Sequence, residues 1–175
     1  MASNKITLAS MLFLTILAYS NAKLGHLKET KLTVYFQDYS GDQNTSVIGI
    51  PVSSNGALNF SKFGAMFCTD DPITAGFEEG SAVIARGRGV HVTSALDGSS
   101  THVMVSIVFI DGKYKGSSIE IYGSDMQFEK VREVAVVGGT GKFRLARGYS
   151  TFESLYSDPV RAHTIIQFNA TILHY

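Results

Sequence analysis

The chain has 175 residues, and its 15 acidic and 15 basic side chains give a net charge of zero at neutral pH. No dense run of basic residues is present, so the composition argues against nucleic acid as a partner. The single cysteine, Cys68, excludes an intramolecular disulfide, and the fold must therefore be stabilised by packing. No histidine or basic residue lies close to Cys68 in sequence, so we interpret it as a small buried residue rather than a reactive thiol.

The first element along the chain is a predicted targeting signal. Lys5 precedes the apolar run 6–17, and Ser20-Asn21-Ala22 supplies the small residues that signal peptidase requires. This run is too short to favour a membrane span, and no later segment is apolar enough for one. We therefore expect residues 1–22 to be a signal peptide, and residues 23–175 to form one secreted domain. Three N-glycosylation sequons fit this route, and they begin at Asn44, Asn59 and Asn169.

The rest of the chain has the pattern of strands and turns. Alternation of apolar and polar residues predicts a first strand at 32–38, and Asp70-Asp71-Pro72 interrupts the next apolar region. Further strands are expected at 81–93, 103–109, 117–122, 132–137, 143–152 and 161–173. About eight strands in one domain predict an all-β fold, an eight-stranded antiparallel β-barrel, because closing the sheet removes its edges. A barrel of this size leaves room for one small ligand.

The glycine-rich stretch 138–142 looks at first like a phosphate-binding loop. A Walker A motif would require glycine at Val136 and a hydroxyl residue at Phe143, and a dinucleotide motif would require glycine at Arg144. None of these positions matches. We therefore interpret the stretch as a turn between two strands.

No metal site or cofactor is predicted, because the five histidines are scattered at spacings unlike those of metal sites. The acidic residues are more informative. Asp38 ends an apolar strand, and Asp125 lies seven residues before Arg132. A carboxyl group in an apolar barrel mouth would have a raised pKa and could transfer protons, while an arginine could position an anionic oxygen. The residues alone leave open that these aspartates only form turns at strand ends.

Several stretches of the chain together resemble the plant dirigent family. They are LTVYFQD at 32–38, TDDPIT at 69–74, ARGRG at 85–89, YGSD at 122–125, and REVAVVGGTGKF at 132–143 followed by ARG at 146–148. The resemblance covers nearly the whole mature chain. It implies an eight-stranded barrel secreted to the apoplast, a homo-oligomer with trimers favoured over dimers, and a pocket for a phenolic substrate.

The resemblance implies two kinds of chemistry. Dirigent proteins lack an oxidative centre and direct the coupling of phenoxy radicals that a separate laccase or peroxidase makes, as in lignan formation. Related pterocarpan synthases instead dehydrate an isoflavanol and close a ring. Both routes pass through a quinone methide, which a single pocket with acid and base groups can serve. A third alternative is a barrel that only binds a hydrophobic ligand or a wall polymer.

The resemblance also implies roles for particular residues. Asp38 and Asp125 would transfer protons, and Arg132 would orient a phenolic or leaving oxygen. Five residues would contact the substrate: Phe36, Asp71, Arg86, His91 and Thr93. His91 is equally compatible with an acid or base role and with a packed strand position.

Two differences from the family pattern bear on the substrate. Lignan-forming members commonly have tyrosines where this chain has residues 89–93, and they often carry a cysteine near each end of the mature chain. Both features are missing here. The differences favour the dehydratase over a coupling reaction of coniferyl alcohol.

Overall fold

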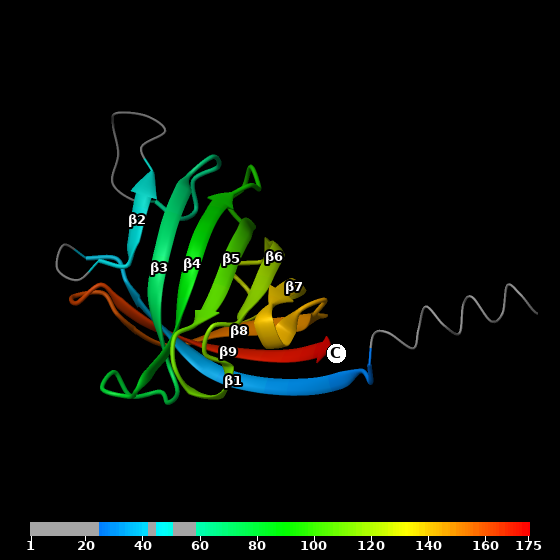
Figure 1. Ribbon diagram of the computed structural model, residues 1–175. Coiled ribbons are helices and arrows are strands. Elements are labelled where there is room, and N and C mark those ends of the chain that lie inside the picture. Colours follow the sequence, from blue (N-terminus) through cyan, green and yellow to red (C-terminus); the bar gives the residue numbers. More distant parts are fainter. Residues whose placement is uncertain (1–24, 42–44, 51–58) are drawn as a thin grey trace, which may run out of the picture.

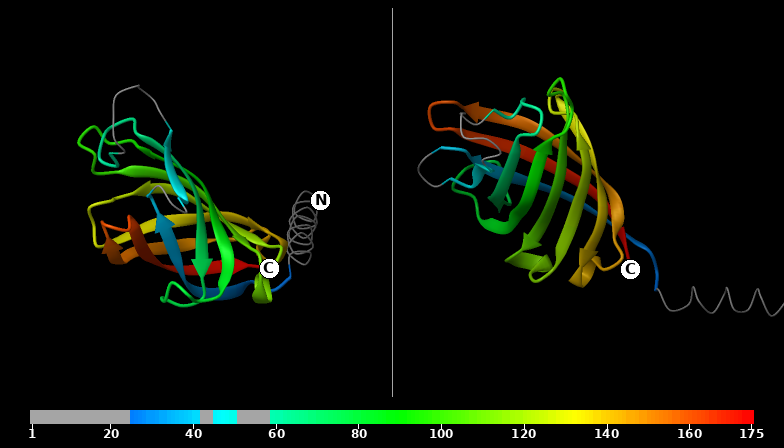
Figure 2. Two further views of the ribbon diagram at one scale, coloured as in Figure 1. Left: turned by 90° about the vertical axis from the view of Figure 1, so that its left-hand side faces the viewer. Right: turned by 90° about the horizontal axis from the view of Figure 1, so that it is seen from above.

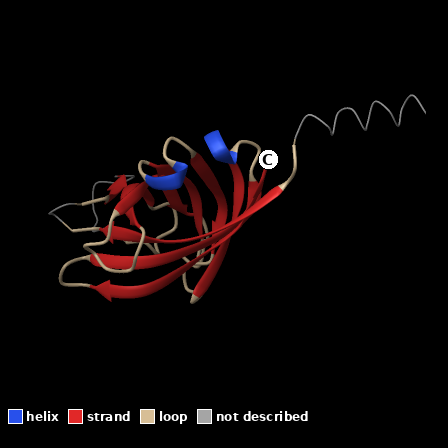
Figure 3. Cartoon of the chain, turned by 60° about the horizontal axis from the view of Figure 1, so that its bottom comes forward, coloured by secondary structure: helices blue, strands red, loops and turns tan. Residues whose placement is uncertain are grey.

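The structure is a computed structural model that describes residues 25–41, 45–50 and 59–175. The predicted signal peptide and the sequon at Asn44 lie outside these residues. The described part of the chain is almost entirely β-structure, with two short 3-10 turns that lie side by side (Figure 3). No helix in the described ranges is long and apolar enough to cross a membrane.

The elements follow one another in the order expected for a β-meander. The strands are β1 (Lys28–Tyr39), β2 (Val47–Ile50), β3 (Met66–Thr74), β4 (Val83–Thr93), β5 (Thr101–Phe109), β6 (Ser118–Asp125), β7 (Val131–Thr140), β8 (Arg147–Asp158) and β9 (His163–His174). The 3-10 turns are η1 (Gly112–Tyr114) and η2 (Gly141–Phe143).

The strands close into a barrel (Figures 1 and 2). From β3 to β9, each strand pairs antiparallel with the next, and β9 pairs with β1 over its whole length. The ring is completed by two residue pairs between β1 and β3, Tyr35 with Thr74 and Phe36 with Ile73. The pairings found for β2 are with β3 alone, outside this ring. Eight strands therefore form the closed antiparallel barrel that the sequence predicted.

One end of the barrel is filled by aromatic rings. Phe143 in η2 is fully buried, with its ring centroid 4.8 Å from that of Tyr114, 5.8 Å from that of Phe109 and 5.2 Å from the imidazole of His174. Burial of large rings supplies much of the stabilisation of a core that has no disulfide. We call this the closed end. The open end is the opposite one, where β1, β4, β6 and β8 finish.

Two predicted boundaries are wrong. β3 runs without interruption through Asp70-Asp71-Pro72. On one side, the pairing of β3 with β2 ends at Thr69 and its pairing with β1 begins at Ile73, so Pro72 has no partner strand there. Its missing N–H therefore breaks no ladder hydrogen bond on that side. The turn after β7 also comes later than predicted. Gly138 and Gly139 belong to β7, while Phe143 lies in the turn η2, and the next strand begins only at Arg147.

Steric crowding and backbone geometry explain these glycines. A side chain at Gly139 would lie 2.6 Å from the carbonyl oxygen of Ser118 and 2.7 Å from Phe143. Gly141 has φ of +59°, a conformation that favours glycine, and it starts the turn that inserts Phe143 into the closed end. The glycine-rich stretch thus shapes the barrel, as the turn interpretation anticipated.

The interpretation of Cys68 as a buried residue is also wrong. Its thiol is free and exposed, because Cys68 has the opposite orientation on β3 from its buried neighbours Phe67 and Thr69.

Candidate active site

A pair of carboxyl groups lies in the barrel wall towards the open end. Asp38 on β1 is two residues beyond Phe36 and therefore shares its inward face. Asp71 on β3 shares the inward face of Ile73, and it lies close enough to Asp38 for the charge of Asp38 to raise its pKa. Asp71 is only 5% exposed. Two acidic groups from opposite edges of the seam thus come together in the interior.

The surroundings of this pair favour the protonated form. Burial raises the pKa of Asp38 from 3.8 to about 6. Burial, with the nearby charge of Asp38, raises the pKa of Asp71 to about 7, although two hydroxyl groups oppose the change. Ser46 Oγ donates to Oδ1 of Asp71 at 2.5 Å, and Thr69 Oγ1 donates to Oδ2 at 2.8 Å. Both carboxyl groups therefore change protonation close to neutral pH, as a catalytic acid must.

A third acidic group lies on the opposite wall. Asp125 ends β6, and its Oδ2 is 3.6 Å from Nη1 of Arg132 on β7, with both side chains 13% exposed. Nη2 of Arg132 also donates to Oγ of Ser154 at 3.3 Å. Burial raises the pKa of Asp125, and the positive charge of Arg132 opposes this rise. The Oδ1 atom of Asp125 is buried and has no hydrogen-bond partner among the described residues, so it is available to a substrate proton.

His91 and Thr93 occupy inward positions of β4 but differ in their freedom to act. The Nε2 atom of His91 is buried and has no partner in the described chain, and the rings of His91 and Phe67 form a T-shaped pair with centroids 5.3 Å apart. Burial lowers the pKa of His91 to about 4, so the imidazole is neutral at physiological pH. The hydroxyl of Thr93 donates to the carbonyl oxygen of Phe60 at 2.7 Å. His91 is thus available to a ligand, whereas Thr93 holds the chain before β3 in place.

Three phenylalanine rings pack against one another in the barrel core. The centroid of Phe36 lies 5.8 Å from those of Phe152 and Phe168, which are themselves 5.0 Å apart. The ring of Phe36 lies over Gly87 on β4, where an added Cβ would be 2.4 Å from its Cε1 atom. The glycine in the ARGRG stretch therefore makes room for the Phe36 ring. Phe36 and Phe168 are buried and Phe152 is partly buried, so this cluster is part of the apolar core.

Arg86 does not point into the barrel. It precedes the inward Gly87 by one residue and therefore lies on the outer face of β4. Its Nε atom donates to Oδ1 of Asp70 at 2.7 Å, and Arg88 donates to the same oxygen at 3.1 Å. These contacts lower the pKa of Asp70. The substrate contact predicted for Arg86 is therefore not available from inside the barrel.

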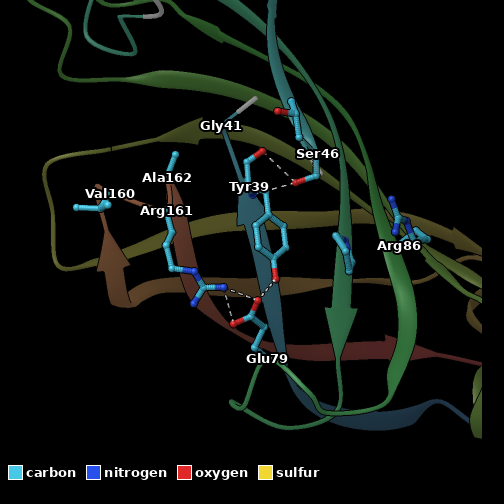
Figure 4. Close-up of a pocket in the computed structure, with 10 residues that line it drawn as sticks. Tyr39, Gly41, Ser46, Glu79, Arg86, Val160, Arg161 and Ala162 are labelled. Atoms are coloured by element: carbon cyan, nitrogen blue, oxygen red, sulfur yellow. Dashed lines mark hydrogen bonds and ion pairs between the residues drawn. The ribbon is translucent and has the colours of Figure 1, made fainter. Parts of the chain in front are cut away.

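Arg86 instead lines a groove on the outside of the barrel, beside the seam between β1 and β3 (Figure 4). The groove has a volume of about 760 Å³. Within it, the carboxylate of Glu79 accepts two hydrogen bonds from Nη2 of Arg161, at 2.7 and 2.9 Å, and one from the Tyr39 hydroxyl at 3.1 Å. Its lining is Tyr39, Gly41, Thr45, Ser46, Pro72, Glu79, Arg86, Val160, Arg161 and Ala162. We call it the outer groove.

Sequence reasoning identified Asp38, Asp71 and the Asp125–Arg132 pair individually. It missed the pairing of Asp38 with Asp71, and it missed Ser46 and Thr69, whose hydroxyls hold Asp71. The alternation along β3 could have predicted that Thr69 lies beside Asp71, because both residues share the inward face with Phe67 and Ile73. Among the described residues no group of three histidine, cysteine, aspartate or glutamate side chains is arranged to hold a metal ion.

The two sequons within the described residues are in different settings. Asn59 is exposed, and its Oδ1 atom accepts the backbone N–H of Ser61 at 3.0 Å. Asn169 lies on the outer face of β9, where its Oδ1 atom accepts a hydrogen bond of 2.7 Å from Thr33. Glycosylation at either site stays a prediction.

The architecture defines a small β-barrel with acidic groups at its open end. A family model described as "Dirigent-like protein" matches residues 29–173, and the chain belongs to this family. It is 34% identical over 160 residues to dirigent protein 15 of Arabidopsis thaliana, covering 88% of this chain and 84% of that one. It is 30% identical over 162 residues to pterocarpan synthase 1 of Glycyrrhiza echinata, covering 92% and 84%.

Solved structures agree with the sequence comparisons. The pterocarpan synthase dirigent protein GePTS1 superposes with a TM-score of 0.78 at 31% identity, over 86% of this chain and 87% of that one. A second pterocarpan synthase dirigent protein, PsPTS1, gives a TM-score of 0.76 at 30% identity, over 85% and 96%.

Proposed function

We propose that the barrel binds a phenolic substrate, moves protons on it, and sets the face on which a new bond closes through a quinone methide. The reaction that uses the acidic groups most directly is the dehydration and cyclisation of an isoflavanol. The observation that carries this proposal is the Asp38–Asp71 pair, whose burial keeps an acidic proton available near neutral pH. Similarity to pterocarpan synthases supports the same reaction class.

The steps follow from the positions of the acidic groups on two opposite walls of the barrel. The protonated carboxyl pair donates a proton to the leaving hydroxyl, the C–O bond breaks, and water departs. Asp125 accepts the proton of the conjugated phenol, which leaves a neutral quinone methide, and Arg132 orients the oxygen that carries the developing charge. A second phenol of the substrate then adds to the methide carbon. Asp125 returns its proton to the quinone methide oxygen and takes the proton of the adding hydroxyl. The substrate loses one water overall.

Incubation of the purified protein with an isoflavanol and no oxidant tests this proposal. We expect a cyclised product with loss of water. Replacement Asp125→Asn or Asp71→Asn should lower kcat/KM by about 10² to 10⁴-fold, the usual contribution of a general acid or base. Asp70→Asn is the matched control, since Asp70 is adjacent to Asp71 but lies on the outer face, and it should retain activity. Absence of product from the wild-type protein with every isoflavanol tried would refute the lyase.

A second candidate is the direction of radical coupling, with phenoxy radicals supplied by a separate laccase or peroxidase. Similarity to dirigent protein 15 favours it. Product that forms only with an oxidase and a monolignol, and with chiral excess only when the protein is present, would identify this function. Binding without either product would leave the third alternative, a barrel that only binds its ligand.

We also propose that the protein forms homo-oligomers, with trimers favoured by the family resemblance. A row of neighbouring outward residues supports this, because it continues across seven paired strands without a charge: Ile48, Cys68, Val90, Met104, Tyr122, Ala135 and Tyr149. Ile48 is 55% exposed, Tyr122 48% and Tyr149 51%, so one copy of the chain leaves much apolar surface in water. Sedimentation of the wild-type protein and of Tyr122→Lys tests this, with dissociation expected for the variant.

Secretion to the apoplast and glycosylation remain part of the proposal. The apolar run 6–17 and the sequons support both. Expression in plant cells, followed by sequencing of the mature N-terminus and deglycosylation, would test them. A mature chain that retains residues 1–22 would refute the signal peptide.

A further inference from the structure

Ser46 occupies the gap in the barrel wall between the interior and the outer groove. β1 and β3 pair only at Tyr35–Thr74 and Phe36–Ile73, and towards the open end they have no direct pairing. The backbone of Ser46 bridges this gap. Its N–H donates to the carbonyl oxygen of Tyr39 at 2.8 Å, and its carbonyl oxygen accepts the N–H of Asp70 at 2.9 Å.

The side chain of Ser46 faces both compartments. Its hydroxyl donates to Oδ1 of the buried Asp71 at 2.5 Å and accepts the backbone N–H of Tyr39 at 3.0 Å. A hydroxyl has one proton and two lone pairs, so one lone pair remains free after these two contacts. Ser46 also lines the outer groove, where it lies beside Tyr39 (Figure 4). The Ser46 hydroxyl thus lies between the buried carboxyl group of Asp71 and the outer groove.

We propose that Ser46 is a proton relay between the Asp38–Asp71 pair and the outer groove. A water or small acid in the groove gives a proton to the free lone pair of Ser46 Oγ, and the original hydroxyl proton passes to Oδ1 of Asp71. The groove retains hydroxide or the conjugate base, and no bond to carbon changes. The hydroxyl then turns back, because the carbonyl oxygen of Tyr39 lies 3.5 Å away as an alternative acceptor.

The relay rests on the proposed function and explains how the site is reset. In the steps above, the carboxyl pair loses a proton to the departing water, while Asp125 finishes each cycle protonated. These groups lie on opposite walls, β1 and β3 against β6 and β7. The next cycle requires the pair to regain a proton, but Asp71 is only 5% exposed and the partly exposed Asp38 faces the interior. Ser46 supplies the route from outside while a ligand fills the interior.

The other charged groups near the relay can be separated from Asp71 by the direction of their pKa shifts. Asp38 faces Asp71 from β1, and Arg86 acts on Asp71 from the outer face. In the groove, the contacts with Arg161 keep the pKa of Glu79 below its ordinary value, and burial raises that of Tyr39. Behind Tyr39, burial lowers the pKa of His163. Between about pH 6.5 and 10, above the ordinary pKa of histidine and below that of tyrosine, Asp71 is therefore the principal titrating group at the seam.

Carbon-13 NMR of the aspartate carboxyl groups tests the relay without turnover. Ser46→Ala and Thr69→Val each remove one hydrogen bond to Asp71, but of the two residues only Ser46 lines the groove. Both variants should raise the pKa of Asp71. Near the midpoint of the Asp71 titration, Ser46→Ala should show separate signals for the protonated and ionised carboxyl group, because proton exchange on Asp71 becomes slow without the relay. Wild type and Thr69→Val should each give one averaged signal. Ser46→Thr should restore averaging, and Ser46→Cys provides a second variant if the alanine variant fails to fold.

A kinetic measurement separates this inference from the proposed function. With an isoflavanol, Ser46→Ala should lower kcat by about tenfold or more, increase the solvent deuterium isotope effect on kcat, and respond to small buffer acids such as imidazolium. Averaged Asp71 signals in Ser46→Ala would overturn the relay, whatever the activity. Slow exchange in Ser46→Ala, together with a wild-type protein that dehydrates no isoflavanol, would support the relay and refute the lyase.

Discussion

Replacement Asp71→Asn should stabilise the protein, and by more at high pH than at low pH. The change of pKa from 3.8 in the unfolded chain to about 7 in the fold means that the native state binds the proton more tightly. At ~1.4 kcal/mol for each pH unit, ionised Asp71 costs up to about 4 kcal/mol at pH 8. Because Asp38 and Asp71 titrate together, we expect Asp71→Asn to increase the free energy of unfolding at pH 8 by about 1 to 3 kcal/mol of this amount.

The sign of the pH dependence follows from the raised pKa. Between about pH 4 and pH 7 the native state holds a proton on Asp71 that the unfolded state has released, so wild-type stability falls as pH rises through this window. An asparagine amide has no charge to bury, and it can still accept from Ser46 and donate to Thr69. The difference in stability between variant and wild type should therefore be small at pH 5 and large at pH 8.

Urea unfolding at a series of pH values measures this difference. In thermal unfolding at pH 8, the melting temperature of Asp71→Asn should exceed that of wild type by roughly 2–10 °C for a domain of this size. Asp70→Asn is the matched control with the opposite sign, because Arg86 and Arg88 lower the pKa of Asp70 and its ionised form is favoured in the fold. A stability difference for Asp71→Asn that does not change between pH 5 and pH 8 would refute the reasoning.

Three further predictions follow from single contacts. Gly87→Ala should destabilise the fold by about 1–3 kcal/mol, measured by urea unfolding, because its Cβ would lie 2.4 Å from the ring of Phe36; an unchanged midpoint would show that the ring moves freely. The imidazole of His91 should titrate near pH 4 in proton NMR, and a midpoint above 6 would mean that it is not buried. Arg132→Gln should raise the pKa of Asp125, because it removes the cation 3.6 Å from Oδ2, and the carboxyl carbon-13 titration should move to higher pH; no movement would mean that the ion pair is absent in solution.

The barrel was predictable because its pattern is local. Strands with alternating apolar residues, such as Val103, Ile107 and Phe109, place one face inside whatever their neighbours are. The same alternation could have predicted that Arg86 faces outward. Its neighbour Gly87 faces inward, and adjacent residues of a strand lie on opposite faces. The position of the turn at Phe143 was harder to predict from the sequence, because an aromatic residue in a 3-10 turn resembles the start of a strand.

The sequence by itself determined the fold class and family, and it identified Asp38, Asp71, Asp125 and Arg132 as candidate residues, since strand periodicity and motif order are properties of short segments. The tertiary structure alone decided which of them meet. Asp38 and Asp71 come together because β1 closes on β3, a long-range pairing of two residue pairs that no local pattern specifies. The same closure leaves the gap that Ser46 fills, so the contact between the acid pair and the outer groove is a consequence of the barrel seam.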